Sequence, residues 1–157
     1  MSTERSQSDR EQENGSIVLK EHKVIRTFKG EVLDEIPVSE IKVIGEFTTA
    51  NGPYIDDWFI TIATKDYWYE LSMYMIGWEK LLEELSEIFE MQLQYKFTNS
   101  TEWKTRIMYP NELAEKELYD WVDLEPKTTW EKFRKLVGFQ KSIRQFTSEV
   151  TKILNKE

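Results

Sequence analysis

Two stretches of alternating apolar residues, joined by a short turn, constrain the fold of this chain more than any other feature. In residues 58–63, Trp58, Ile60 and Ile62 alternate with Phe59, Thr61 and Ala63. In residues 67–75 every odd-numbered position is aromatic or apolar. Alternation with period two is typical of β-strands. The turn at Lys65-Asp66 is short enough to require that the two strands run antiparallel. We therefore expect a β-hairpin over residues 58–75.

The segment after this hairpin has the pattern of an amphipathic helix. Counted from Trp78, apolar residues stand at positions i, i+3, i+4, i+7, i+10 and i+11, and glutamates occupy much of the remainder. This spacing places the apolar side chains on one helical face. They are Trp78, Leu81, Leu82, Leu85, Ile88 and Phe89. We expect a helix over residues 78–89 with its acidic face outward.

Further strands are expected on both sides of this hairpin and helix. Two segments rich in β-branched residues meet at Lys29-Gly30, which predicts a hairpin or meander. In the strand before the main hairpin, Val43 and Phe47 share one face and Glu46 falls on the other. Residues 99–110 fit either a helical turn or a strand. The expected strands are residues 17–28, 31–36, 41–47, 93–97 and 118–122.

The last thirty residues carry helix signals. Thr128 and Glu131 occupy the positions of a capping box, and an apolar stripe begins at Trp130. Beyond Gly138, which is expected to bend the helix, apolar residues step by 4, 3, 4 and 3, as in a heptad seam. They are Phe139, Ile143, Phe146, Val150 and Ile153. We expect a long C-terminal helix that docks on the body, pairs with a partner or a second copy, or lies on an anionic membrane.

This order of elements predicts an α+β protein. We expect a mostly antiparallel sheet, curved or closed into a small barrel, with one internal helix and a long C-terminal helix. One such architecture is that of pleckstrin-homology-like domains, from which the internal helix departs. Residues 1–16 have almost no apolar content and are expected to form a disordered tail. Residues 17–126 would form an acidic body, and residues 127–157 a basic, helical C-terminal segment.

Charge is distributed unevenly between these parts. The formal net charge is −8, yet residues 127–157 hold eight Lys or Arg against three Glu. An acidic body argues against nucleic-acid binding, which depends on basic residues. No apolar run approaches the length of a membrane span, and the N-terminus lacks the apolar core of a signal peptide. These features predict a cytoplasmic protein with no integral membrane segment.

The residue types needed for catalysis are scarce. The chain has no cysteine, and its one histidine, His22, lies in a charged stretch. No phosphate-binding loop or metal motif is present. We therefore expect no catalytic residue, no metal and no cofactor. The alternative is a small-molecule-binding or metal-dependent hydrolytic domain, in which Asp56 or Asp57 joins Glu46 or Glu70 across the sheet.

The loop before the main hairpin is a candidate recognition surface. Asn51-Gly52 favours a tight turn and Pro53 stiffens the next residues, so aromatic and acidic side chains would stand at a loop tip. In the expected hairpin, Phe59, Trp68 and Tyr74 lie on the face opposite Trp58, Ile60 and Ile62. A solvent-facing strand normally has polar residues there, so another surface must cover these aromatic side chains. The candidate partner-binding residues are Tyr54, Asp56, Asp57, Phe59, Trp68 and Tyr74. The alternative is an ordinary loop, with Tyr54 folded onto the core.

Together these features predict a non-catalytic protein-binding or regulatory domain that acts through an acidic, aromatic-rich surface. Its partner would be another protein of basic character. In composition the chain is comparable to small acidic proteins that neutralise a basic enzyme or toxin, as bacterial immunity proteins do. A lipid- or peptide-binding module of the pleckstrin-homology-like type is a further alternative. A homodimer through the C-terminal helix also stays open.

Overall fold

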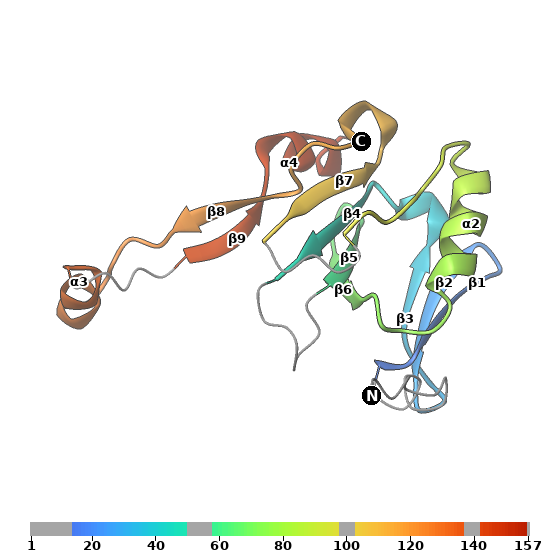
Figure 1. The fold of residues 1–157 in the computed structure, drawn as a ribbon, viewed down its shortest axis with the longest axis horizontal. Coiled ribbons are helices and arrows are strands. Elements are labelled where there is room, and N and C mark those ends of the chain that lie inside the picture. The colour runs from blue at the N-terminus through green and yellow to red at the C-terminus, as the bar shows by residue number, and fades with distance from the viewer. Residues whose placement is uncertain (1–13, 50–57, 98–102, 137–141, 157) are drawn as a thin grey trace, which may run out of the picture.

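The computed structural model describes residues 14–49, 58–97, 103–136 and 142–156. Within these residues, nine strands form three antiparallel sheets, accompanied by three α-helices and two short 3₁₀ helices (Figure 1). The predicted α+β class and the antiparallel pairing are confirmed. The sheets are separate, so the predictions of one curved sheet and of a closed barrel are wrong. The pleckstrin-homology-like architecture stays a prediction. The tail expected over residues 1–16 lies almost wholly outside the described residues.

The first sheet is a meander. Its second turn is Lys29-Gly30, as predicted, and its first is Glu21-His22, which divides the single strand expected over residues 17–28. All four turn residues have positive φ, the backbone that two-residue hairpin turns of this hand require. The strands, in spatial order, are β1 (Ser16–Lys20), β2 (Lys23–Phe28) and β3 (Glu31–Pro37).

The central sheet contains the predicted hairpin. Its order is β6-β5-β4-β7, with every pair antiparallel. The segment 105–109, for which the sequence pattern fitted both helix and strand, is an edge strand. Residues 92–97 form neither a strand nor a helix, so the strand expected over residues 93–97 is wrong. The strands are β4 (Val43–Thr48), β5 (Trp58–Ala63), β6 (Trp68–Ser72) and β7 (Thr105–Tyr109), and the 3₁₀ helices are η1 (Val38–Glu40) and η2 (Asn111–Leu113).

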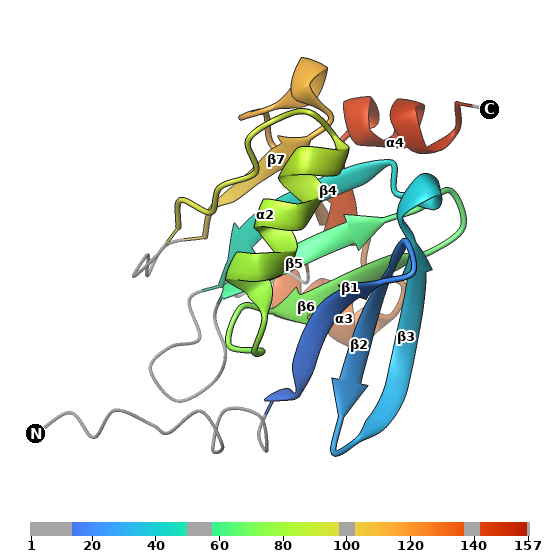
Figure 2. The same cartoon turned by 90° about the vertical axis from the view of Figure 1, so that its right-hand side faces the viewer.

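One face of the central sheet packs against the first sheet and helix α2 (Trp78–Ile88), which confirms the predicted amphipathic helix (Figure 2). Ile44, Ile60 and Ile62 from the sheet meet Leu81 and Leu85 from the helix, and all five are fully buried. The glutamates of α2 face away from this core, as the periodicity predicts. We call this side of the sheet the first face.

The second face is covered by the C-terminal part of the chain. Fully buried Phe47 and Ile107 from the sheet pack with Leu118 and Val150. Gly45 makes this possible, because a Cβ atom there would lie 2.4 Å from a methyl group of Leu118. The covering elements are β8 (Tyr119–Asp123), β9 (Ser142–Phe146) and α4 (Ser148–Leu154).

The prediction of a single long C-terminal helix is wrong. Strand β9 pairs with β8 along residues 142–146, and α4 begins only after Thr147, whose hydroxyl accepts a bond from the amide of Val150 at 3.5 Å. The capping box is confirmed at α3 (Thr129–Leu136): the Glu131 amide donates to the Thr128 hydroxyl, and the Thr128 amide donates to the Glu131 carboxylate, both at 3.2 Å. From Ile143 to Ile153 the heptad spacing arises because a strand and a short helix follow each other, and Gly138 and Phe139 lie outside the described residues.

The β8–β9 hairpin and α3 form a projection that we call the arm, residues 119–136 and 142–146. It leaves the body at one end of the longest axis, and α2 lies at the other end (Figures 1 and 2). No helix within the described residues is long and apolar enough to cross a membrane.

Candidate functional site

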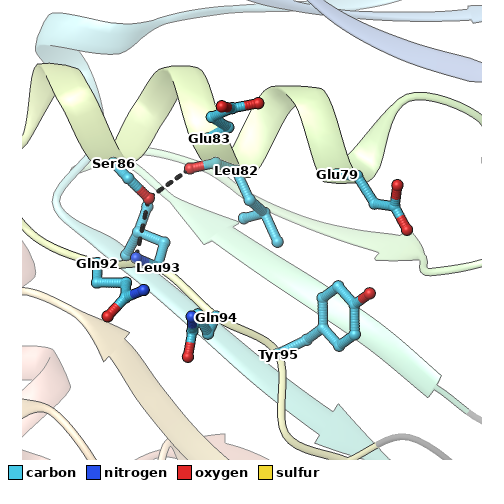
Figure 3. A pocket seen from close by; sticks show the side chains of 8 residues that line it. All are labelled: Glu79, Leu82, Glu83, Ser86, Gln92, Leu93, Gln94 and Tyr95. Atoms are coloured by element: carbon cyan, nitrogen blue, oxygen red, sulfur yellow. Dashed lines mark hydrogen bonds between the residues drawn. The ribbon is translucent and has the colours of Figure 1, made fainter.

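A groove of about 500 Å³ runs between α2 and the irregular segment 92–97 (Figure 3). Its floor is apolar, since Leu82 and Leu93 lie there almost completely buried. Carboxylates stand on the helix side, where Glu79 and Glu83 are one helical turn apart. The lining residues are Glu79, Leu82, Glu83, Ser86, Gln92, Leu93, Gln94 and Tyr95.

The far wall of the groove carries an aromatic ring. Tyr95 is 36% exposed. Figure 3 shows the Glu79 side chain turned toward the side of the groove on which Tyr95 lies. The Tyr95 ring meets the Trp58 ring edge-to-face, with centroids 5.3 Å apart. This contact fixes the orientation of an otherwise exposed tyrosine. The groove therefore combines an apolar floor, an acidic rim and an aromatic wall.

Ser86 fastens one end of the wall to the helix. Its hydroxyl donates to the carbonyl of Leu82 at 2.5 Å and accepts from the amide of Leu93 at 2.9 Å (Figure 3). A serine hydroxyl often bonds the carbonyl four residues earlier in a helix. Here the hydroxyl also accepts a bond from the Leu93 amide, and this second bond fixes the position of the 92–97 segment relative to α2.

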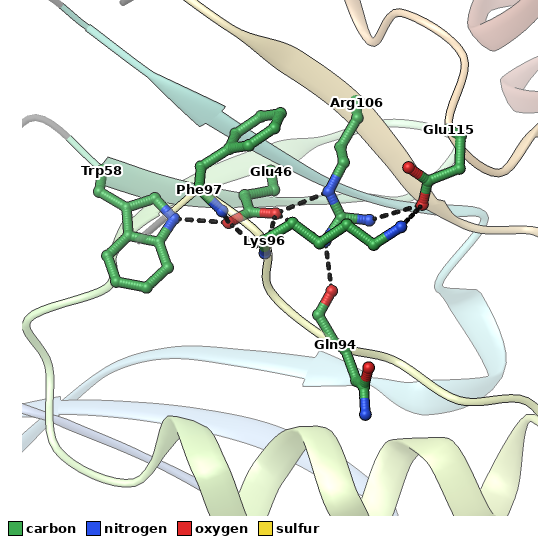
Figure 4. A network of polar contacts seen from close by, with 7 residues as sticks. All are labelled: Glu46, Trp58, Gln94, Lys96, Phe97, Arg106 and Glu115. Atoms are coloured by element: carbon green, nitrogen blue, oxygen red, sulfur yellow. Dashed lines mark hydrogen bonds and ion pairs between the residues drawn. The ribbon is translucent and has the colours of Figure 1, made fainter. Parts of the chain in front are cut away.

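A buried carboxylate fastens the other end of the wall. Glu46, at the middle of β4, is completely buried, and its two oxygens accept bonds from three parts of the chain (Figure 4). One oxygen accepts from the Trp58 indole at 2.7 Å and from the Phe97 amide at 2.9 Å. The Lys96 amide lies 3.0 Å from the other. We call Glu46 and these donors, together with Arg106, the hub.

Arg106 supplies the opposite charge from the neighbouring strand β7, directly across from Glu46. Its guanidinium bonds the Glu46 carboxylate at 2.7 and 2.8 Å. It also donates to the Gln94 carbonyl and, at 3.1 Å, to Glu115. A hydrogen bond from Lys96 and the nearby Arg106 charge lower the pKa of Glu115. A buried charge is stable only when it is paired and hydrogen-bonded in this way.

The hub gives the groove a fixed wall rather than a reactive group. Gln94, Lys96 and Phe97 are all held by Glu46 or Arg106, so Tyr95, which lies between them, has little backbone freedom. The oxygens of Glu46 are surrounded by donors and have no contact with solvent. A carboxylate surrounded in this way holds its neighbours in position.

Glu70, the second carboxylate expected to join the Asp56–Asp57 pair, is also in use. It accepts from the Tyr119 hydroxyl at 3.2 Å and pairs with Arg144 at 3.2 Å. Among the described residues, no group of three Asp, Glu or His side chains could hold a metal ion. Asp56 and Asp57 lie outside the described residues, so the hydrolytic alternative stays a prediction.

Of the candidate partner-binding residues, the structure describes Phe59, Trp68 and Tyr74, so the predicted surface as a whole stays a prediction. Tyr54, like Asp56 and Asp57, lies outside the described residues. Phe59 is half-buried and stacks on Phe47 with ring centroids 5.1 Å apart, so it packs with the core on the second face of the central sheet. Trp68 is 60% exposed, and one edge meets the Phe146 ring. Tyr74, at the end of the hairpin, is exposed.

The groove residues were not singled out from the sequence. Glu79 and Glu83 look like an ordinary solvated helix face, and Tyr95 fits the alternation of an expected strand. One signal was available: Arg106 stands directly before Ile107 and Met108 in a strand-like run. A charged residue in such a run indicates a buried ion pair.

Comparison with protein-family models, with curated proteins and with solved structures gave no match, so the function is inferred from the geometry of this chain.

Proposed function

We propose that this chain is a non-catalytic protein-binding domain whose groove binds a basic segment of a partner protein. The observation that carries the proposal is the placement of an apolar floor, an acidic rim and an aromatic wall around one groove. A Lys or Arg side chain has matching parts. Its aliphatic stem would lie along the groove above Leu82 and Leu93, and its cation would lie between the Glu79 carboxylate and the Tyr95 ring.

The rigidity of the groove supports this proposal. The hub fixes Lys96 and Phe97, and Ser86 fixes Leu93, so both ends of the wall are held before a ligand arrives. A preformed site loses less conformational entropy on binding than a flexible one. Hub residues would then affect affinity without touching the ligand.

The charge of the molecule also favours a basic ligand. Helix α2 has four Glu against one Lys, and the whole chain is formally −8. A surface of one sign raises the association rate of an oppositely charged partner, and salt weakens the effect. Binding through this groove should therefore be fast at low salt and should weaken as salt is added.

The test is a titration with a capped six-residue peptide of alternating Arg and Ala, followed by calorimetry and by amide NMR shifts. We expect the largest shifts at Leu93 and Tyr95. Replacing both Glu79 and Glu83 by Gln removes two rim charges, each worth about 0.2–1 kcal/mol. The affinity should therefore fall by up to about thirty-fold.

The matched control removes two exposed glutamates from the 3₁₀ helices, Glu40→Gln with Glu112→Gln, and should leave the affinity close to that of wild type. An equal loss in both variants would show that only net charge matters, and the groove proposal would be wrong. Absence of binding at low salt to a single chain with an open groove would also contradict it.

A further inference from the structure

The arm carries an apolar stripe that no other described part of the chain covers. On α3, Trp130, Phe133 and Leu136 are 66%, 53% and 85% exposed. The Trp130 and Phe133 rings stack on each other with centroids 5.7 Å apart, and Figure 1 shows α3 well away from the body. Exposed apolar stripes of this kind mark contact surfaces.

Basic residues surround this stripe. From Lys127 to Leu136 the sequence holds four Lys or Arg and one Glu. With 3.6 residues per turn, Lys132 falls beside Leu136 on one edge of the stripe, and Arg134 falls beside Trp130 on the other. The arm tip is therefore an apolar and aromatic strip between two cations. It has the chemistry that the groove would bind.

Building on the proposed function, we propose that the groove of one copy binds the arm tip of a second copy, so that the chain forms a closed two-fold dimer. Charge complementarity selects this partner, because the arm tip is basic and α2 is acidic. Contact between two arm tips would instead bring like charges together. Aromatic side chains on the arm and the exposed part of the Tyr95 ring provide the apolar part of the contact.

The shape of the molecule permits closure. Because α2 and α3 lie at opposite ends of the longest axis, an arm does not reach its own groove (Figures 1 and 2). Two copies lying side by side and antiparallel bring each arm to the groove of the other. A two-fold axis then makes both contacts identical, and no surface is left open for further copies.

The test is the mass in solution, measured by light scattering on a sizing column over a range of concentrations. We expect wild type to have twice the mass of the single chain. Reversing the arm charges, Lys132→Glu with Arg134→Glu, and reversing the groove charges, Glu79→Lys with Glu83→Lys, should each give a single chain. Like charges then meet at both contacts.

Mixing the two variants gives the decisive result. In a mixed pair, the reversed arm of one chain meets the reversed groove of the other, and the two unchanged surfaces meet each other. Both contacts are again complementary, so the equimolar mixture should have twice the single-chain mass. Circular dichroism and thermal melting establish that each variant is folded.

Two control variants test whether any reversal of surface charge breaks the dimer. Charge reversal away from both surfaces, Glu40→Lys with Glu112→Lys or Lys152→Glu with Lys156→Glu, should leave the dimer intact. A single-chain mass for wild type at every concentration, masses that grow without limit, or failure of the mixed variants to pair would each overturn the inference. Binding of the Arg-Ala peptide to the arm variant, whose groove is unchanged, tests the proposed function separately.

Discussion

Each face of the central sheet has one carboxylate that ties a distant segment to it, and the two differ in burial. On the first face, Glu46 holds residues 94–97 through the hub. On the second, Glu70 holds the base of the arm through Tyr119 and Arg144. The Glu46–Arg106 pair is 0% and 6% exposed at its side chains, whereas the Glu70–Arg144 pair is 34% and 26% exposed.

This difference assigns different roles to similar chemistry. A buried pair is costly to break, because the remaining charge has neither water nor a partner. An exposed pair contributes little, because water and salt compensate its loss. The groove wall is therefore held by charge and hydrogen bonds, while the arm base depends mainly on the apolar contact of Leu118 with Gly45 and Phe47.

The largest expected effect comes from Arg106→Met. It leaves the Glu46 carboxylate buried without its guanidinium, and the free energy of unfolding should fall by about 3–5 kcal/mol in urea titration. Adding Glu46→Gln to this variant removes the stranded charge but keeps an acceptor for the Trp58 indole and the Phe97 amide, so it should recover a large part of the loss. A single-variant loss below about 1 kcal/mol would show that the hub is no tighter than a surface pair.

The second effect concerns the packing of the second face. Gly45→Ala places a methyl group against Leu118, which should cost about 1–3 kcal/mol of unfolding free energy through overpacking. In a Leu118→Ala background the same substitution should cost much less, because space has been made. Equal costs in both backgrounds, measured as a double-mutant cycle, would separate Gly45 from the arm base.

The third effect is removal of the Tyr119 hydroxyl, which bonds Thr61 at 2.8 Å as well as Glu70. Tyr119→Phe should lower the unfolding free energy by about 0.5–1.5 kcal/mol. Burial raises the pKa of Tyr119 above its ordinary value of 10.0. Its protonated form is thus favoured by folding, and this stability is complete below pH 10 and lost as the pH rises toward the folded pKa.

Melting temperatures across alkaline pH check the sign of this effect. The wild-type value should fall more steeply above pH 10 than that of Tyr119→Phe, since only wild type has a buried phenol to ionise. Parallel curves for the two proteins would indicate that Tyr119 titrates like an exposed tyrosine.

The smallest effect is expected for Glu70→Gln, which keeps an acceptor for Tyr119 and removes the charge facing Arg144. Because this pair is about one-third exposed at Glu70, the loss should stay within about 1 kcal/mol and shrink as salt is added. A loss as large as that of Arg106→Met would remove the contrast between the two faces.

Local sequence patterns correctly predicted the helix and the hairpin whose formation depends on residues close together in the sequence. Alternation through residues 58–75 gave the main hairpin, and 3.6-residue periodicity gave α2. The positive-φ turn at Lys29-Gly30 was visible as a strand break. The C-terminal error had a local cause: Phe146 and Val150 are four apart because Thr147 ends a strand and caps a helix between them. A threonine before Ser-Glu is itself a helix-start signal.

The groove was hidden because its residues are far apart in the sequence. Glu46 lies on the strand face expected to be polar, and its partner Arg106 is 60 residues away. No local pattern pairs them, since the register of β4 with β7 depends on how the whole sheet forms. Segment 92–97 kept the alternation of a strand, but its amides bond a carboxylate and a serine instead of another strand.

The hub has a further consequence, on the timescale of hydrogen exchange. Residues 92–97 lie outside regular structure, where amide protons normally exchange through small local openings. The amides of Lys96 and Phe97 instead donate to a carboxylate sealed inside the sheet, so releasing them leaves that carboxylate short of donors at a place where water cannot replace them. Their protons should exchange as slowly as those of the central strands. This short irregular segment would then unfold together with the core.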